Sequence, residues 1–279
     1  MWLKLFKRTD KFAVLRRELN RWDAAGKTCQ LWLRDDDLAA ITPQFQRLQA
    51  LVEKHDVPAL LSVIPGQAVP TLGKDTLAMH HFQFAQHGWR HQNHEQPEHR
   101  KSEFGPARGS AAIRHDMLKG ARRMSELFGE RYINVFVPPW NNLAEDSMAA
   151  TSYAGMSRHV SMGKVNLPAG MVETNTHVDL LRWTATPTLQ APDWIVGQLS
   201  RFLGRQRKGK DTLPAVGLLS HHLVMGNDAW QFLDELLDLT SSFPCVRWAR
   251  PSELFHLPMQ EAGLLRAPVL APAHALGFT

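Results

Sequence analysis

Three consecutive aspartates, Asp35 to Asp37, follow a short apolar segment early in the chain. Carboxylates packed this closely repel one another unless a cation offsets their charge. An aspartate in front of a helix can instead cap the free N–H groups of the first turn, but a cap needs only one carboxylate. The remaining aspartates therefore favour a cation-binding site.

Histidine is the other unusual feature, with 14 copies. His87 and His91 stand four residues apart in the segment HGWRH. On a helical turn, two such imidazoles share one face and can reach one ion. His94 is a spare candidate ligand. Three further histidines are interpreted as exposed polar side chains: His80, His81 and His99.

Two histidines and one carboxylate form a ligand set that leaves positions open for water and substrate, and it suits zinc, iron, manganese or cobalt. The ion would lower the pKa of a bound water and polarise a substrate carbonyl. An aspartate beside the ligand could act as the base on that water. Hydrolysis of an amide or ester also needs an acid, and either His221 or His222 could donate that proton.

Short apolar segments alternate with amphipathic ones along the 279 residues, of which 44% are hydrophobic and 21% charged. This composition excludes collagen-like and disordered classes and suits one large α/β domain. The apolar segments predict strands over 28–33, 58–64, 82–86, 134–137, 215–220 and 245–248. Helical spacing predicts helices over 12–25, 45–52, 111–128, 143–153, 193–203 and 228–239. Short β-like pieces are expected near 158–161 and 180–183, and the basic segment 205–210 is interpreted as a solvated loop.

Continuous apolar strands that alternate with helices are typical of a parallel sheet covered on both sides. A single (β/α) barrel accounts for this pattern. Four predicted strands end in reactive or rigid residues: Asp35–Asp37, His87, Pro138–Asn141 and His221–His222. Because the carboxyl ends of barrel strands share one face, these distant residues are expected to converge there.

The ordered set of motifs resembles the polysaccharide deacetylase family, also described as the NodB-homology or carbohydrate esterase family 4 fold. The resemblance covers residues 28–248 and implies an α/β protein with a distorted (β/α)7 barrel in a single domain. The segment RDDD resembles the first motif, which implies Asp36 as base and Asp37 as metal ligand, with a one-residue ambiguity of register at Asp35. HGWRH resembles the second motif and implies His87 and His91 as the other ligands.

The later motifs imply the remaining site residues. The segment VPPWN is similar to the third motif, one wall of the cleft, and implies the Trp140 backbone N–H as an oxyanion donor. The same segment implies Pro139 and Asn141 as substrate contacts. Leu219-Ser220-His221 resembles the last motif and implies His221 as the general acid.

Residues 177–183 loosely resemble a segment in which an aspartate tunes the acid histidine and a tryptophan lines the acetyl pocket. Trp183 is expected in that role, and Trp89 is expected to stack on a sugar ring. The third-motif arginine of the family, which pairs with the base aspartate, is replaced by Val137. Candidates for its replacement are Arg34, Arg90 and Arg182.

The resemblance implies a metal-dependent deacetylase, a hydrolase of non-peptide carbon–nitrogen bonds, that removes an acetyl group from an N-acetylated saccharide. The implied cofactor is a divalent metal, zinc first, with cobalt, manganese, nickel or iron as alternatives; the implied partner is an acetylated sugar or glycoconjugate. The missing third-motif arginine favours an alternative, a catalytically weak or inactive saccharide-binding protein on the same barrel. The net charge of +5 comes with no nucleic-acid-binding motif, so a nucleic-acid partner is not expected.

Residues 1–27 are expected to form an N-terminal helical extension, residues 28–257 the barrel and residues 258–279 an Ala/Pro-rich tail. No apolar run approaches the roughly 18 residues of a membrane span. The first residues lack the apolar core of a secretory signal, so a cytoplasmic protein is expected. Cys29 and Cys245 indicate neither a disulfide framework nor a Cys-based zinc site.

Overall fold

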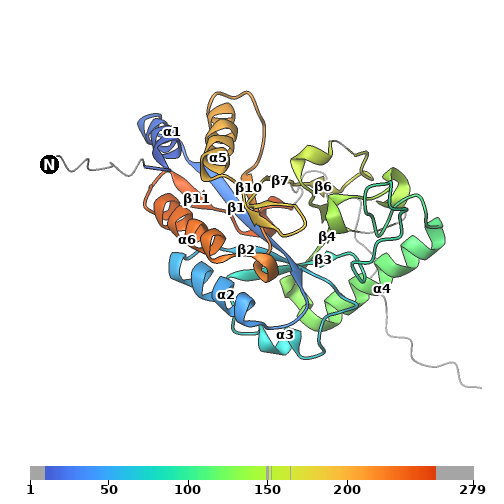
Figure 1. Cartoon of the computed structure of the whole chain (residues 1–279). Helices are drawn as coiled ribbons and strands as arrows, with labels where there is room; N and C mark the ends of the chain where they lie inside the picture. Colours follow the sequence, from blue (N-terminus) through green and yellow to red (C-terminus); the bar gives the residue numbers. More distant parts are fainter. Residues whose placement is uncertain (1–9, 149–150, 152, 164, 256–279) are drawn as a thin grey trace, which may run out of the picture.

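The structure, a computed structural model, describes residues 10–148, 151, 153–163 and 165–255. Its centre is a curved parallel sheet in the order β6-β5-β4-β3-β2-β1-β10-β7, with β11 beside the start of β1 (Figure 1). The strands are β1 (Cys29–Leu38), β2 (Ala59–Val63), β3 (Phe82–His87), β4 (Tyr132–Val137), β5 (Gly155–Met156), β6 (Val172–Glu173), β7 (Thr176–Asp179), β10 (Val216–Ser220) and β11 (Val246–Trp248). A separate antiparallel pair contains β8 (Leu181–Arg182) and β9 (Thr188–Leu189).

The two ends of the sheet belong to one stretch of chain. Only Thr174 and Asn175 separate β6 from β7, yet β6 pairs with β5 and β7 pairs with β10. Backbone hydrogen bonds of 2.8–3.1 Å continue this pairing: Val172 N–H to Ala154, Thr174 N–H to Met156 and Thr176 N–H to Arg158. With β6 and β7 counted as one strand, and with β11 off this path beside β1, seven strands make up the barrel, so the predicted distorted (β/α)7 barrel is confirmed.

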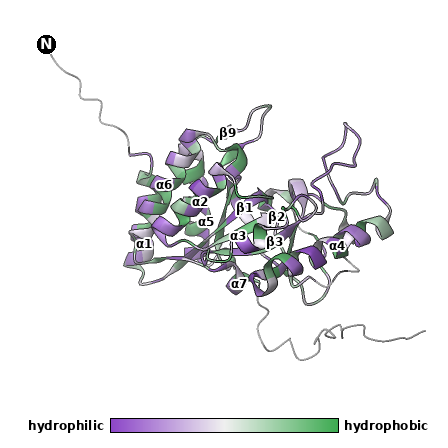
Figure 2. Cartoon of the chain, turned by 90° about the horizontal axis from the view of Figure 1, so that it is seen from below, coloured by the Kyte–Doolittle hydropathy of each residue, from purple (hydrophilic) through white to green (hydrophobic). Residues whose placement is uncertain are grey.

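Helices surround the sheet and turn their apolar stripes toward it (Figures 1 and 2). They are α1 (Ala13–Ala24), α2 (Pro43–His55), α3 (Leu72–Asp75), α4 (Ser110–Phe128), α5 (Pro192–Arg207), α6 (Asn227–Ser241) and α7 (Pro251–Leu254). α1 shares the main core, where Leu15 and Leu19 are fully buried together with Leu203 of α5. The proposed limits of the domains stay predictions, and residues 258–279 lie outside the described part of the chain.

The helix that follows the aspartates does not use them as its cap. α2 begins after Thr42, whose side-chain oxygen accepts a hydrogen bond from the Phe45 N–H at 3.1 Å. Pro43 occupies the first helical position, where its missing N–H costs nothing. Helix capping therefore does not explain why the chain carries three carboxylates at positions 35–37.

Two local expectations are wrong. β1 does not stop near residue 33 but runs to Leu38, because the charged side chains at its end find partners inside the protein. The segment 143–153 has only a 3₁₀ turn, Glu145–Met148, because Leu143 and Ala144 pair with Phe104 instead of continuing a helix. Residues 149, 150 and 152 lie outside the described residues.

Two further segments also differ from their expected secondary structure. The first half of the basic segment 205–210 is the end of α5, where Arg205 pairs with Asp211 and Arg207 pairs with Glu18. The expected β-like piece near 158–161 is present as a single parallel bridge between His159 and Thr176, and it continues into a 3₁₀ turn, Val160–Met162. Among the helices that the structure describes, none has the length and apolar character needed to cross a membrane.

Candidate metal centre and active site

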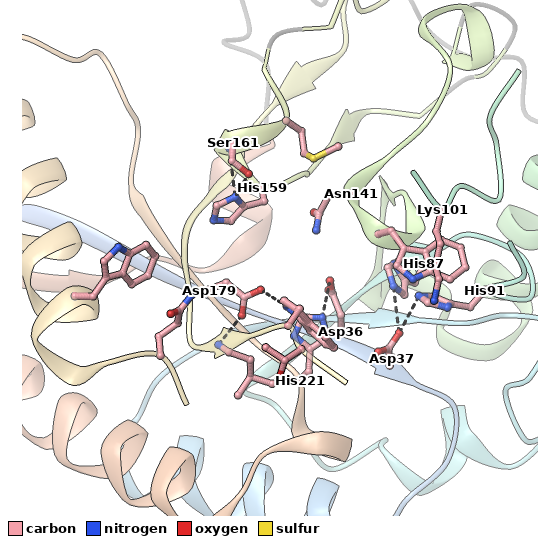
Figure 3. Close-up of a pocket in the computed structure, with 17 residues that line it drawn as sticks. Asp36, Asp37, His87, His91, Lys101, Asn141, His159, Ser161, Asp179 and His221 are labelled. Carbon is pink, nitrogen blue, oxygen red and sulfur yellow. Dashed lines mark hydrogen bonds and ion pairs between the residues drawn. The ribbon is translucent and has the colours of Figure 1, made fainter. Parts of the chain in front are cut away.

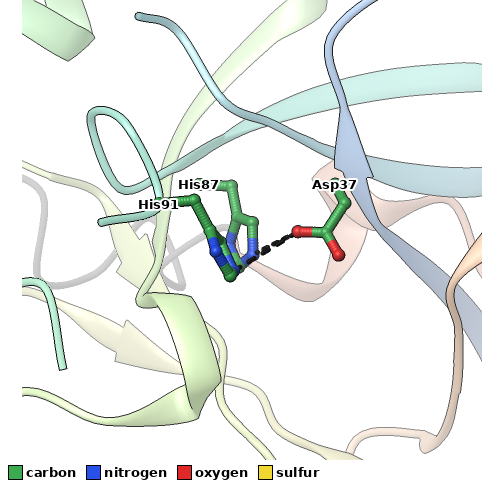
Figure 4. Close-up of side chains that lie close together, drawn as sticks. All are labelled: Asp37, His87 and His91. Atoms are coloured by element: carbon green, nitrogen blue, oxygen red, sulfur yellow. Dashed lines mark ion pairs between the residues drawn. The ribbon is translucent and has the colours of Figure 1, made fainter. Parts of the chain in front are cut away.

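Asp37, His87 and His91 come from separate parts of the chain, and their side chains meet (Figure 4). The Oδ1 atom of Asp37 lies 3.3 Å from Nε2 of His87 and 3.4 Å from Nε2 of His91. The three potential ligand atoms lie within 4.8 Å of one another. The predicted convergence of these residues is therefore present in the fold.

A bulge in β1 gives Asp37 its direction. Side chains alternate between the two faces of a strand, so Asp36 and Asp37 would ordinarily point to opposite sides. The pairing of β1 with β2 shifts register between Asp35 and Leu38, and Asp37 has a φ of +75°. Because of this irregularity, Asp36 and Asp37 both line one cavity, whereas Asp35 is fully buried elsewhere.

The two histidines are held in different ways. His87 ends β3, and its Nδ1–H donates to the carbonyl of Val137 at 2.9 Å, which leaves Nε2 facing Asp37. The expected helical turn between the histidines is wrong, because positive φ values at Gly88 (+64°) and His91 (+55°) break helical geometry. A loop brings the imidazoles together instead, and the His91 ring packs against Trp140 with centroids 4.3 Å apart.

This donor set fits a divalent cation. Tetrahedral zinc with bonds of about 2.0–2.1 Å holds its ligand atoms about 3.3 Å apart, close to the observed spacing. Asp37 Oδ1 is buried and has no hydrogen-bond partner among the described residues, although buried polar atoms usually have one. Burial and the neighbouring His87 lower the pKa of His91 to about 4, so its imidazole is neutral at neutral pH and able to coordinate.

Arg34 forms a buried ion pair with Asp36. Its Nη2 lies 2.9 Å from Asp36 Oδ2, and neither side chain is more than 2% exposed. The same guanidinium donates to Asn141 Oδ1 at 2.8 Å and to Ser157 Oγ at 2.9 Å. Burial opposes the charge of Asp36, but Arg34, followed by His87 and His221, lowers the pKa of this carboxyl below its ordinary value.

This ion pair identifies the arginine that lies beside Asp36, the proposed counterpart of the third-motif arginine. Of the three candidates, Arg34 alone has a charge partner in the described cavity, while Arg90 and Arg182 are exposed. Strand alternation explains why Arg34 can reach Asp36: residues two apart on a strand point to the same face.

Asp35 and His222 form a second buried pair, apart from the cavity. Asp35 Oδ1 lies 2.5 Å from His222 Nδ1, and Oδ2 accepts hydrogen bonds from Ser220 Oγ at 2.6 Å and from the His222 N–H at 3.0 Å. Burial lowers the pKa of His222, but the Asp35 carboxylate outweighs it and raises the pKa above its ordinary value. Both side chains are fully buried, so this pair stabilises the fold and has no access to a substrate.

His221 lies beside Asp36, with its Nε2 3.8 Å from Asp36 Oδ2. The Trp183 ring stands edge-on to the His221 ring at a centroid distance of 4.6 Å. Trp183 Nε1–H donates to Asp179 Oδ2 at 2.7 Å, and Asp179 Oδ1 accepts from the Leu181 N–H. Asp179 therefore contacts Trp183, and the indole in turn contacts His221.

These groups share one cavity of about 710 Å³ (Figure 3). Figure 3 shows Asp36 and His221 between Asp179 on one side and the three potential metal ligands on the other. Trp140, Asn141 and Trp183 also line the cavity.

Two expected substrate contacts lie elsewhere. Trp89 packs against Lys119, whose Nζ is 4.7 Å from the ring, and is absent from the cavity lining. Pro139 is buried beneath Gly88, where a Cβ on that glycine would come within 2.6 Å of the proline ring. Trp89 is partly buried against the cluster that contains Ile113 and Met117 of α4, so neither residue is retained as a substrate contact.

Sequence reasoning missed several residues of the cavity wall. They come from loops, a 3₁₀ turn and the first turn of α5, and none belongs to a motif: Lys101, His159, Ser161, Met162, Gln190 and Trp194. His159 and Ser161 lie across the cavity from Asp37 in Figure 3. No spacing or composition signal marks these positions, because they become neighbours only when the barrel closes.

No family model matches the sequence, and no curated relative does. Solved structures do share its fold. A protein described as a polysaccharide deacetylase from Mycobacterium smegmatis is 15% identical, with a TM-score of 0.61 over 82% of this chain and 90% of that one. A family 4 acetyl xylan esterase from Clostridium thermocellum, in complex with cobalt, is 12% identical, with a TM-score of 0.51 over 81% and 90%.

A third structure, the T48 deacetylase with substrate, is 14% identical, with a TM-score of 0.50 over 84% of this chain and 93% of that one. At these identities the similarity establishes architecture. The chain has the fold of the polysaccharide deacetylases, as its motifs predict.

Proposed function

We propose that this protein is a metal-dependent deacetylase that hydrolyses the acetyl group of an N-acetylated saccharide. The observation that carries the proposal is the single cavity shared by the candidate ligands Asp37, His87 and His91 with Asp36 and His221. A ligand set, an ionised carboxylate and a second proton-transfer group at one cavity are the parts that metal-assisted hydrolysis of an amide requires.

The first proton transfer is assigned to Asp36. A divalent cation at Asp37, His87 and His91 would supply Lewis acidity that acidifies water and polarises a carbonyl. Asp36 then accepts the proton that the attacking water loses. Arg34 supports this role because its charge holds Asp36 ionised despite burial, and its bonds to Asn141 and Ser157 fix where the carboxylate lies.

His221 is assigned the second proton transfer, to the leaving amine. It lies next to Asp36 and in contact with Trp183, and it lines the cavity that the substrate would enter. His222 is not a competing candidate on geometry, since it is fully buried against Asp35.

The Trp140 backbone N–H is proposed to donate to the developing oxyanion. Trp140 and Asn141 have consecutive positive φ values of +54° and +55°, which are unfavourable for side chains other than glycine. Such strain persists only where the surroundings hold it, and the Arg34 hydrogen bond to Asn141 does so. The unusual backbone supports a role for this turn beyond connecting two elements.

Zinc is the proposed metal, because two nitrogen donors and one carboxylate oxygen with the observed spacing suit a tetrahedral ion. Cobalt, manganese, nickel and iron accept similar ligands. A cytoplasmic location stays a prediction.

A saccharide-binding protein with little or no catalysis is the second candidate. Its main support is that Val137 stands where the family has the arginine that pairs with the base aspartate. Arg34 now occupies that place, so this support is weakened. The exposed Trp183 and Trp194 at the cavity would bind a sugar face in either case.

The test combines metal analysis with acetate release. Purified protein is expected to bind about one equivalent of zinc and to release acetate from at least one N-acetylated sugar in a panel that also contains O-acetylated sugars. Chelation should abolish release and added zinc should restore it. Metal binding and sugar binding without acetate release from any member would favour the second candidate.

A further inference from the structure

We propose that Glu103 is a positioning residue that holds the loop after β3 in the shape that brings His91 to Asp37 and His87. The inference rests on the metal centre proposed above. Glu103 carries no recognised motif and does not line the cavity, yet it is only 1% exposed.

The carboxylate of Glu103 receives three consecutive backbone N–H groups of that loop. Its Oε1 accepts from Arg90 N–H at 2.7 Å, and its Oε2 accepts from the N–H groups of Trp89 and His91, both at 3.1 Å. Hydrogen bonds from backbone amides to an ionised carboxylate are among the stronger ones in proteins. One side chain therefore accepts the hydrogen bonds of all three backbone N–H groups from Trp89 to His91.

The loop needs such a partner because of its backbone. Left-handed φ values at Gly88 and His91 turn successive N–H groups toward one point, an arrangement that binds anions. Buried N–H groups without an acceptor are costly, and a left-handed conformation is unfavourable for histidine. The carboxylate of Glu103 thus compensates for a conformation that the His91 ligand position requires.

Glu103 is itself firmly placed. Ser102 next to it donates through its N–H to Asn93 Oδ1 at 2.9 Å and through its Oγ to the Asn142 carbonyl at 3.0 Å. On the other side, the carbonyl of Phe104 accepts from the Ala144 N–H at 2.9 Å. Glu103 therefore links the loop that carries His91 to the chain that follows the Trp140 turn.

Gly88 shows how close this contact is. A Cβ at Gly88 would lie 2.1 Å from Glu103 Oε2, in addition to the strain that a side chain would meet at its positive φ. Gly88→Ala therefore perturbs the same contact without removing the carboxylate. Position 88 therefore needs a glycine, because any side chain there would block the approach of the Glu103 carboxylate.

The experiment measures zinc affinity by chelator competition, and amide exchange of residues 87–91 in the metal-free protein, for the wild type, Glu103→Ala, Glu103→Gln and Gly88→Ala. We expect Glu103→Ala to raise the zinc Kd by about 10–100-fold, as found for residues that orient metal ligands. Exchange of the loop amides should accelerate in the same variant. Glu103→Gln keeps the size and one acceptor oxygen and should have an intermediate effect, and it serves if Glu103→Ala does not fold.

Two matched controls separate positioning from general stability. Glu18→Ala removes a glutamate that is similarly buried but pairs with Arg207 on α5, and Glu95→Ala removes one that accepts from the Ala107 N–H in the same long loop. Both should leave the zinc Kd within about twofold of the wild type.

Unchanged zinc affinity in the folded Glu103 variants would overturn the inference and leave the proposed metal centre intact. Failure of the wild type itself to bind zinc would overturn the metal centre, and the inference with it.

Discussion

Arg34 and Asp36 lie two residues apart on β1, point into the same interior, and form an ion pair of 2.9 Å with almost no exposure to solvent. Two further acceptors, on Asn141 and Ser157, complete the surroundings of the guanidinium. An isolated charge in this position would be very unfavourable, so each residue of the pair depends on the other. The stability of the barrel is therefore coupled, through this ion pair, to the protonation state of Asp36, the proposed base.

A double-mutant cycle should reveal this dependence. Arg34→Gln is expected to lower the free energy of unfolding by about 3–5 kcal/mol, because it leaves the Asp36 carboxylate buried without its cation. Arg34→Gln combined with Asp36→Asn should lose less than the sum of the single losses. Denaturant unfolding measures all four proteins. The same cycle on the exposed pair Arg205–Asp211 is the control and should show much weaker coupling; additive losses at Arg34 and Asp36 would contradict the prediction.

Removal of any of the proposed ligands should abolish metal retention. Asp37→Ala, His87→Ala and His91→Ala are each expected to reduce zinc, measured by elemental analysis after gel filtration, from about one equivalent to background, because two remaining ligands bind weakly. His99→Ala, at an exposed histidine, is the control. A triple variant that held as much zinc as the wild type would show that the ligands are wrongly assigned.

The adjacent histidines 221 and 222 should respond in opposite ways. His221→Ala is expected to keep the metal and the fold but to slow acetate release by about 10²–10⁴-fold, the usual contribution of a general acid. His222→Ala leaves Asp35 buried without its partner and should lower stability by about 3–5 kcal/mol. Steady-state rates and unfolding curves of both variants decide the matter; an unchanged rate in His221→Ala would point to another proton donor.

His177 should make stability depend on pH. Its Nδ1 accepts from the Gly217 N–H at 2.9 Å, and burial, with His159, lowers its pKa to about 4. An unfolded histidine has a pKa of about 6.5, so between about pH 4 and 6.5 the unfolded state binds more protons and stability falls as pH falls. The full loss is about 3 kcal/mol, since one pKa unit is about 1.4 kcal/mol.

The variant that tests this is His177→Asn, whose side-chain oxygen can accept the same Gly217 hydrogen bond without titrating. We expect a flatter dependence of unfolding free energy on pH between about pH 4 and 6.5 than in the wild type. Equal slopes in the two proteins would exclude His177 as the source.

Much of the barrel is encoded locally and could be predicted from the sequence. Apolar runs such as Ala59–Val63 and the helical stripe of Ser110–Phe128 appear close to their expected limits, because their burial follows from short-range patterns. β1 was predicted too short, because a strand that ends in RDDD looks like a surface segment. Its partners, among them His222 and Ser157, lie more than a hundred residues away.

The same limit applies to the site. Asp37, His87 and His91 could be found because residue type and motif spacing point to them. The loop geometry that joins the two histidines could not be found, since a spacing of four also fits a helical turn, and the positive φ values at Gly88 and His91 that rule out the helix are visible only in the structure. Glu103 could not be found either, because a single glutamate among polar neighbours carries no pattern.

The position of β1 in the barrel has a consequence for how the protein forms. β1 is flanked by β2, its near neighbour in the chain, and by β10, so that Leu31 lies opposite Val216. Pairing over such a separation closes a very long loop, which makes folding slow. During synthesis the first half of the barrel must wait with one edge of β1 uncovered until the last quarter of the chain emerges, and the chain is most prone to aggregate during that interval.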